Sequence, residues 1–192
     1  MKTSLLIFFI IFLKCVVDLK QIPVMREANS PVYKLDKVLF IGKIDIYMAD
    51  RELITQAWKF SFASIIKSHR IFKNVEPLPN DLSKLPTDYL IIDLDIIPKF
   101  ENEYNWWWTW PAIYPMTGYW PIQKRTGKYN LEILYKITNH KGEELKKGKI
   151  SKNSEQNIMF YGFFRIHEIE KMIEIANLEA MEECARTLNA SF

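Results

Sequence analysis

Two carboxylates in the middle of the chain have a spacing that could hold a metal ion. Asp93 and Asp95 alternate with apolar residues, so both point to the same face of a predicted strand, about 7 Å apart. Paired carboxylates of this kind bind a divalent metal in nucleotide-sugar transferases. The motif is short and arises easily by chance, which favours a solvated outer face of the strand. We therefore predict no metal site.

The histidines do not form a recognisable catalytic or metal-binding pattern. His69, His140 and His167 lie far apart, and His167-Glu168 lacks the second histidine of a zinc-protease helix. Neither a glycine-rich phosphate loop nor a Gly-x-Ser-x-Gly nucleophile motif occurs. Catalytic groups need not be neighbours in sequence, so an enzyme of unrecognised type is the third alternative for the function. We expect a protein that is not an enzyme and uses no cofactor.

Tryptophans are concentrated in one short segment. Five of the six lie within fifteen positions: Trp106, Trp107, Trp108, Trp110 and Trp120. Consecutive residues cannot all face one core, so either part of this set is exposed or the loop folds over an end of the sheet and buries some of them. Tryptophan is favoured at protein interfaces and at the membrane–water boundary, because it combines a large apolar body with a polar N–H. We predict an interaction surface, with a carbohydrate-stacking platform and a loop clamped on the core as the alternatives.

The N-terminus has the pattern of an export signal. Lys2 precedes nine apolar residues, 5–13, which match the hydrophobic part of a signal peptide and are too short to span a bilayer. Cys15 follows, as in bacterial lipoproteins, where such a cysteine becomes the acylated first residue. Lys14 departs from that pattern, because a small residue normally precedes the cysteine. A signal cut elsewhere, an uncleaved anchor and a cytosolic chain are the alternatives to a signal peptide at 1–14 with a lipid on Cys15.

The charge pattern argues against nucleic acid as a partner. The formal net charge is +3, and the densest basic cluster, Lys146-Lys147-Gly148-Lys149, sits beside Glu143-Glu144. A nucleic-acid site needs a more one-sided electrostatic field.

The second cysteine, Cys184, falls on the apolar stripe of a predicted helix, where buried packing is the expected role.

The hydrophobic pattern predicts five strands and two helices. Alternation of apolar and polar residues indicates strands at 37–47, 70–77, 87–103, 127–139 and 143–152. Helical spacing indicates helices at 52–69, with Trp58 and Phe62 on a stripe that Phe60 widens, and at 166–188, with Ile173 and Cys184 on its stripe. The turn at 139–142 makes the last two strands a hairpin, and the last of them, with its lysines, reads as a protected edge strand.

This order of elements predicts an α+β fold. One mixed β-sheet with two helices on one face, a two-layer sandwich, satisfies it, and an aromatic insert loop joins the third strand to the fourth. Residues 15–36, with Pro23 and Pro31, read as a lipid-anchored tether, and residues 37–192 as a single domain.

The chain resembles a group of bacterial envelope lipoproteins whose fold is similar to the N-terminal domain of TolB and to the penicillin-binding-protein activator LpoB. The resemblance rests on the strand Thr87-Asp88-Tyr89-Leu90-Ile91-Ile92-Asp93-Leu94, the insert at 106–121, the strand Tyr129-Asn130-Leu131-Glu132-Ile133, the turn Gly142-Glu143-Glu144-Leu145 and the final helix. It covers roughly residues 37–188. It implies an accessory or interaction role and brings no catalytic residues.

These observations together predict an exported lipoprotein that acts as a non-catalytic interaction or accessory module. We expect it in the bacterial cell envelope, at the outer membrane, held there by the lipid on Cys15 and contacting an envelope protein. The alternative is a protein that binds carbohydrate or peptidoglycan through the tryptophan-rich insert.

Overall fold

The computed structural model describes residues 17–19, 21–22, 33–47, 51–81, 85–104, 125–158 and 166–190. Within these ranges the strands are β1 (Leu35–Ile46), β2 (Phe72–Pro77), β3 (Tyr89–Tyr104), β4 (Arg125–Asn139) and β5 (Glu144–Ile158). The helices are α2 (Arg51–Ser68) and α4 (Ile166–Asn189). No helix in the described part of the chain is long and apolar enough to cross a membrane.

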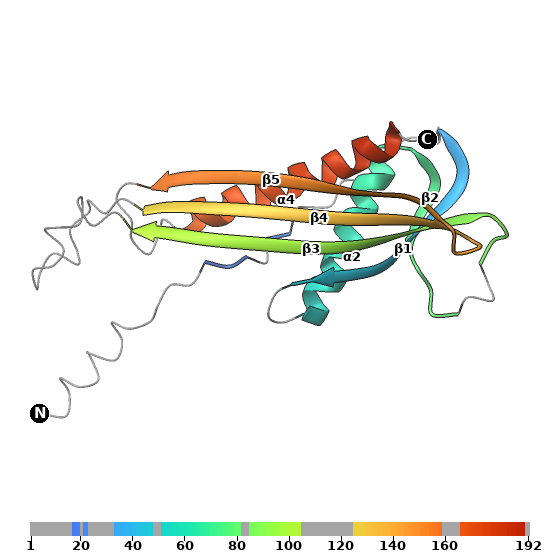
Figure 1. Cartoon of the computed structure of the whole chain (residues 1–192), viewed down its shortest axis with the longest axis horizontal. Helices are drawn as coiled ribbons and strands as arrows, with labels where there is room; N and C mark the ends of the chain where they lie inside the picture. Colours follow the sequence, from blue (N-terminus) through green and yellow to red (C-terminus); the bar gives the residue numbers. More distant parts are fainter. Residues whose placement is uncertain are drawn as a thin grey trace, which may run out of the picture.

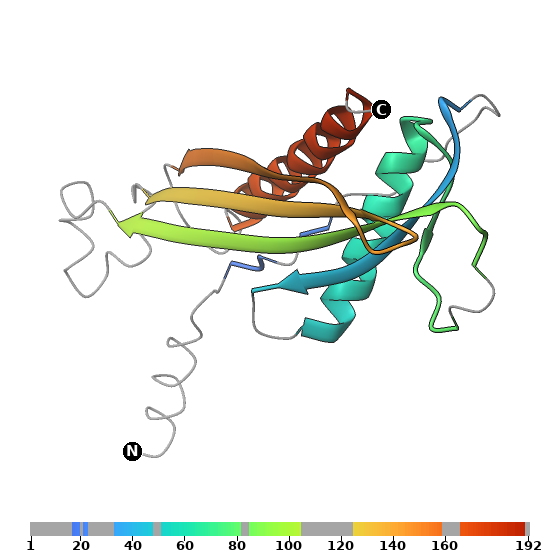
Figure 2. The same cartoon turned by 45° about the vertical axis from the view of Figure 1, so that its right-hand side comes forward.

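The strands form one mixed sheet in the order β2-β1-β3-β4-β5. β1 is parallel to both β2 and β3, whereas β3, β4 and β5 are antiparallel neighbours. Helix α2 packs on β1 and β2, helix α4 packs on β4 and β5, and the helices touch each other on the same side of the sheet (Figures 1 and 2). The predicted α+β sandwich of a mixed sheet with two helices on one face is confirmed.

The core lies between this sheet face and the helices, and the alternation in the strands creates it. Every second residue is buried from Leu90 to Ile96 in β3 and from Tyr129 to Ile137 in β4: Leu90, Ile92, Leu94, Ile96, Tyr129, Leu131, Ile133, Tyr135 and Ile137. The facing helix stripes include Trp58, Phe62, Ile173 and Cys184, as predicted. Phe60 was wrongly assigned to the stripe of α2. Its side chain is 49% exposed, because two residues past Trp58 the helix has turned by about 200°.

The edge strand β5 runs past the predicted end at Lys152 and continues to Ile158. Its last third, Asn-Ser-Glu-Gln-Asn, is polar and reads as a loop in sequence. It is a strand because the first residues of β4 pair with it, and Thr126 Oγ1 lies 2.7 Å from Asn157 Oδ1 across the two strands. The predicted position of this strand at an edge is correct.

Candidate interaction surfaces

The residues predicted to carry the function lie outside the described residues. These are Cys15, Trp106, Trp107, Trp108, Trp110 and Trp120. The structure does describe the chain on both sides of the insert. Tyr104, the last residue of β3, pairs with Arg125, the first residue of β4, so the two strands that carry the insert end side by side (Figure 1). The roles of Cys15 and of the five tryptophans stay predictions.

The described residues between 17 and 22 pack against the domain. Val17 is only 9% exposed and belongs to the hydrophobic core, and Leu19 and Ile22 lie against it. The backbone N–H of Asp18 donates a hydrogen bond of 3.2 Å to Glu170 Oε1 on α4. The segment falls within the predicted tether at 15–36, and that prediction did not include these contacts.

A buried asparagine ties this segment to the sheet. Asn177, on α4, is completely buried, and its Nδ2 donates a hydrogen bond of 2.6 Å to the carbonyl oxygen of Gln21. Its Oδ1 accepts a hydrogen bond of 2.8 Å from the hydroxyl of Tyr129 on β4. Burial raises the pKa of Tyr129 well above its usual value, so the hydroxyl keeps its proton and acts as the donor. Buried polar groups need hydrogen-bond partners, so Asn177 fixes where the carbonyl oxygen of Gln21 lies.

Sequence reasoning did not find this contact, although one signal was present. Asn177 lies between Ala176 and Ala180 on the buried stripe of α4. A polar residue in such a stripe indicates a buried partner. The sequence does not reveal that the partner is a backbone carbonyl 156 residues earlier in the chain.

The second face of the sheet has no helix over it among the described residues (Figure 2). It carries a groove of about 580 Å³ across β1, β3, β4 and β5. Its lining side chains include Lys43, Asp45, Asp93, Asp95, Leu134, Lys136, Lys147 and Lys149. The lining carboxylates come from β1 and β3, and three of the four lysines come from β4 and β5, while Lys43 on β1 pairs with Asp45.

The two aspartates of the predicted strand lie in this groove, on the outer face where the sequence placed them. Asp93 Oδ1 accepts a hydrogen bond of 2.7 Å from the backbone N–H of Lys43, where the register of β1 shifts. A side chain at Gly42 would collide with the same carboxylate, so Asp93 supports the irregular part of β1. Within the described ranges, no group of three or more His, Cys, Asp or Glu residues is arranged to hold a metal ion.

The lysines of the groove form ion pairs within the sheet surface. Lys43 contacts Asp45, which raises the pKa of Lys43 through a hydrogen bond and the opposite charge. Lys149 Nζ lies 2.9 Å from Glu132 Oε1 and lowers the pKa of that carboxyl. These pairs are exposed, so they hold side chains in place and contribute little to stability.

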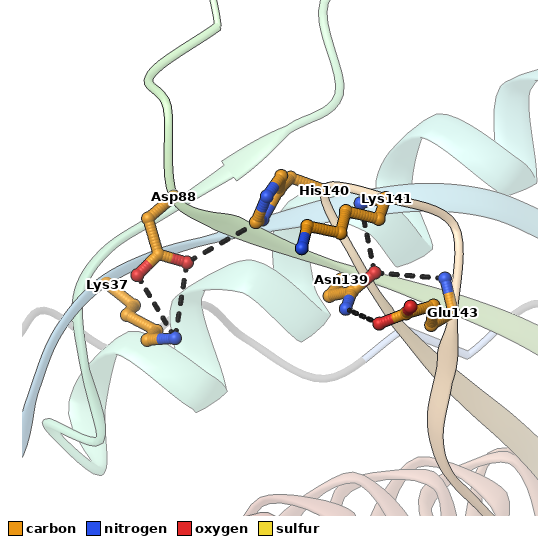
Figure 3. Close-up of polar contacts among 6 residues, drawn as sticks. All are labelled: Lys37, Asp88, Asn139, His140, Lys141 and Glu143. Atoms are coloured by element: carbon orange, nitrogen blue, oxygen red, sulfur yellow. Dashed lines mark hydrogen bonds and ion pairs between the residues drawn. The ribbon is translucent and has the colours of Figure 1, made fainter.

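A polar cluster lies at the end of the sheet where β3 begins and β4 ends (Figure 3). Asp88 faces Lys37, whose Nζ is 3.1 Å from Oδ2, and His140 Nδ1 lies 3.9 Å from its Oδ1. Asn139 closes the hairpin: its Oδ1 accepts hydrogen bonds of 2.9 Å from the N–H groups of Lys141 and Glu143. The hydrogen bonds of Asn139 close the turn. Among the residues drawn, no histidine forms a catalytic arrangement with a nucleophile.

Cys184, on α4, lies in the hydrophobic core of the domain, as predicted. It is a free, completely buried cysteine, and burial raises the pKa of its thiol to about 12. Since thiolate is the reactive form, this thiol is inert at neutral pH.

Comparisons with known proteins support the fold. A family model of uncharacterised proteins matches residues 5–189. No curated protein matches the chain in sequence. Among solved structures, the chain is similar to one from Helicobacter pylori assigned as a homolog of a neuraminyllactose-binding hemagglutinin, with 12% identity and a TM-score of 0.52. That alignment covers 88% of this chain and 92% of the other, and it shows a shared fold.

Two further solved structures align over most of the chain with lower TM-scores. One is a minor lipoprotein from Acinetobacter baumannii, with 9% identity and a TM-score of 0.37, covering 84% of this chain and 91% of that one. The other is a PelC dodecamer from Paraburkholderia phytofirmans, with 11% identity and a TM-score of 0.34, covering 83% and 96%.

Proposed function

Because this chain belongs to an uncharacterised protein family whose model spans residues 5–189, we propose its function from its own surfaces. It is an exported bacterial lipoprotein that works as a non-catalytic interaction or accessory module of the cell envelope. The lipid is carried by Cys15, and the relation to the TolB-like and LpoB-like lipoproteins is part of the same proposal.

The position of the leader relative to the fold supports export. Cleavage before Cys15 removes residues 1–14 and leaves every described residue in the mature chain. A cut a few residues later would remove Val17, which belongs to the core. The packed segment therefore favours processing at or before Cys15.

The uncovered sheet face is the observation that carries the interaction role. It extends over four strands, carries both carboxylates and lysines, and exposes the apolar side chain of Leu134 at 36%. Shallow, mixed surfaces of this kind suit contact with another protein better than enclosure of a small substrate. The segment that joins β3 to β4 adds five tryptophans to the chain.

Fatty-acid labelling in a bacterial host tests the lipid. We expect label on the wild-type chain, no label on Cys15→Ser, and release of that variant from the membrane fraction. Cys184→Ala is the matched control and should keep the label, because its thiol is buried. Absence of label on the wild type would refute the lipoprotein assignment, with Lys14 as the physical reason. Separation of inner and outer membranes on a density gradient then tests the proposed outer-membrane location.

Crosslinked pull-down from intact cells tests the interaction role, using the full chain and a form without residues 106–121. We expect a crosslinked envelope protein that is lost with the insert. In single variants, at least two of Trp106, Trp107, Trp108 and Trp110 should tolerate alanine with less than about 1 kcal/mol of lost stability, yet weaken the association. A core tryptophan would cost about 3–5 kcal/mol. If all four cost that much and binding is unchanged, the insert is structural.

The five tryptophans also favour a second candidate, the binding of carbohydrate or peptidoglycan. Flat aromatic rings offer apolar faces on which sugar rings can stack. The structure from Helicobacter pylori shares the fold and is named for a protein that binds neuraminyllactose. Co-sedimentation with purified peptidoglycan and titration with neuraminyllactose separate the candidates: saturable binding that the tryptophan variants lose, with no crosslinked protein, would replace the first by the second.

A further inference from the structure

The lipid-bearing position lies next to the packed part of the chain. Only Val16 separates Cys15 from Val17, which is buried in the core. Two hydrogen bonds hold the backbone of the described residues that follow. The N–H of Asp18 donates one to Glu170, and the carbonyl oxygen of Gln21 accepts the other from Asn177. Apolar burial and two hydrogen bonds to α4 thus hold the chain at its exit from the leader.

The covalent reach of the chain limits how far a lipid on Cys15 can be from the domain. Three successive Cα-to-Cα steps lead from Cys15 to Asp18 and span at most about 11 Å. A flexible tether over the whole of 15–36 would instead have a typical end-to-end distance of about 25 Å and could extend to about 70 Å. The packing of the described residues removes most of that length.

We propose that the lipid on Cys15 holds the domain directly against the bilayer surface, with the first turns of α4 beside the membrane. The partner surface is the lipid headgroup layer that receives the acyl chains. This inference rests on the proposed function, because it requires a lipid on Cys15.

The consequence is a restriction on where a protein partner can lie. The sheet is about 50 Å long, since β4 and β5 each have 15 residues that rise by about 3.3 Å. No part of the described domain can then reach a partner much further than this from the bilayer. A protein that the described domain contacts is therefore expected within about this distance of the bilayer.

The test attaches the lipid chemically, so that it does not depend on processing in cells. The chain from Cys15 onward, which keeps every described residue, is coupled through Cys15 to maleimide-phosphatidylethanolamine. The vesicles contain phosphatidylethanolamine and phosphatidylglycerol with a rhodamine-labelled lipid as acceptor. A donor fluorophore is introduced at position 171, an exposed site on α4, by a non-cysteine chemistry. Cys184 does not compete, because it is buried.

Energy transfer to the bilayer reports how closely the domain is held. We expect high transfer for the unmodified chain and a fall of at least about a third after insertion of a twenty-residue Gly-Ser linker between Val16 and Val17. Such a linker adds an average span of about 25 Å. The same linker placed after Ala190 should leave the transfer unchanged.

A matched pair of variants tests the packed segment itself. Val17→Asp places a charge in the core contact and should lower the transfer as the linker does, with the fold checked by circular dichroism. Glu179→Ala, at an exposed position on α4, should not. Equal transfer with and without the linker overturns the inference, as does a fall with both linker positions. Missing acyl label in cells with the expected transfer in vesicles would overturn the proposed function alone.

Discussion

Tyr129 on β4 and Asn177 on α4 are joined by a hydrogen bond of 2.8 Å between two completely buried side chains. The other side of the same carboxamide holds the carbonyl oxygen of Gln21. One residue of α4 therefore connects the sheet with the described segment around Gln21, and substitutions here affect both.

Tyr129→Phe should destabilise the protein by about 1–3 kcal/mol. The ring still fills its site, but Asn177 Oδ1 loses its donor in a buried place. Urea unfolding at pH 7 gives the free energy of unfolding, and hydrogen exchange at Asp18 follows the segment. We expect Tyr135→Phe to cost less, because no hydrogen bond from the Tyr135 hydroxyl is found among the described residues. Equal costs for both would show that the Asn177 contact contributes nothing.

Ile173→Asp should be strongly destabilising, by more than about 3 kcal/mol, because it places an unpaired charge in the core. The neighbouring Glu174→Lys should change stability by less than about 0.5 kcal/mol, since this side chain is partly solvated. Thermal and urea unfolding of both variants make the comparison. Similar melting shifts would contradict the register of α4.

Gly148→Ala should destabilise the sheet by about 1–3 kcal/mol. A methyl group at this position would overlap the ring and hydroxyl of Tyr135, its cross-strand partner, which is itself buried. In combination with Tyr135→Leu, the cost should be smaller than the sum of the two single changes by at least about 0.5 kcal/mol. Strict additivity in a double-mutant cycle would refute the contact.

Asn139→Ala should cost about 1–2 kcal/mol. Its Oδ1 accepts two backbone hydrogen bonds in the hairpin turn, and its Nδ2 donates one of 2.7 Å to Glu143 Oε2 (Figure 3). Asp88→Asn, which removes only exposed ion pairs, should change stability by less than about 1 kcal/mol. A larger loss for Asp88→Asn in urea unfolding would reverse this ranking.

Stability should fall as the pH rises above 9, and Cys184 should account for the first part of the loss. Below pH 9 the thiol is protonated in both states. Above pH 9 the unfolded chain releases this proton, whereas the folded chain, with a pKa of about 12, keeps it. The loss has a slope of up to about 1.4 kcal/mol per pH unit for one group.

Cys184→Ala should make the free energy of unfolding flatter between pH 9 and 10, below the range where the tyrosines titrate. Its stability at pH 8 can be lower, because the core loses a sulfur atom. The measurement is urea unfolding at several pH values under reducing conditions. A slope equal to that of the wild type would show that the thiol does not keep its proton on folding.

The hydrophobic pattern by itself determined the fold class, because each element buries one face. The alternation from Leu90 to Ile96 and the stripe from Ile173 to Cys184 require a sheet and a helix whose apolar sides meet. The prediction of an export leader and of a lipid on Cys15 also comes from residue type and order alone. Phe60 marks the limit: an apolar residue in a helix can still be exposed, since its angular position decides which way it points.

Only the tertiary structure decided which distant groups meet. The polar end of β5 is a strand because β4 supplies backbone partners, which local propensity does not show. Gln21 and Asn177 lie 156 residues apart, and nothing in either local sequence specifies the pairing. The groove with its carboxylates and lysines likewise exists only once four strands lie side by side. Sequence patterns indicate whether a residue lies on the buried face of its strand or helix. The strand order and the positions of the helices determine which residues lie opposite that face.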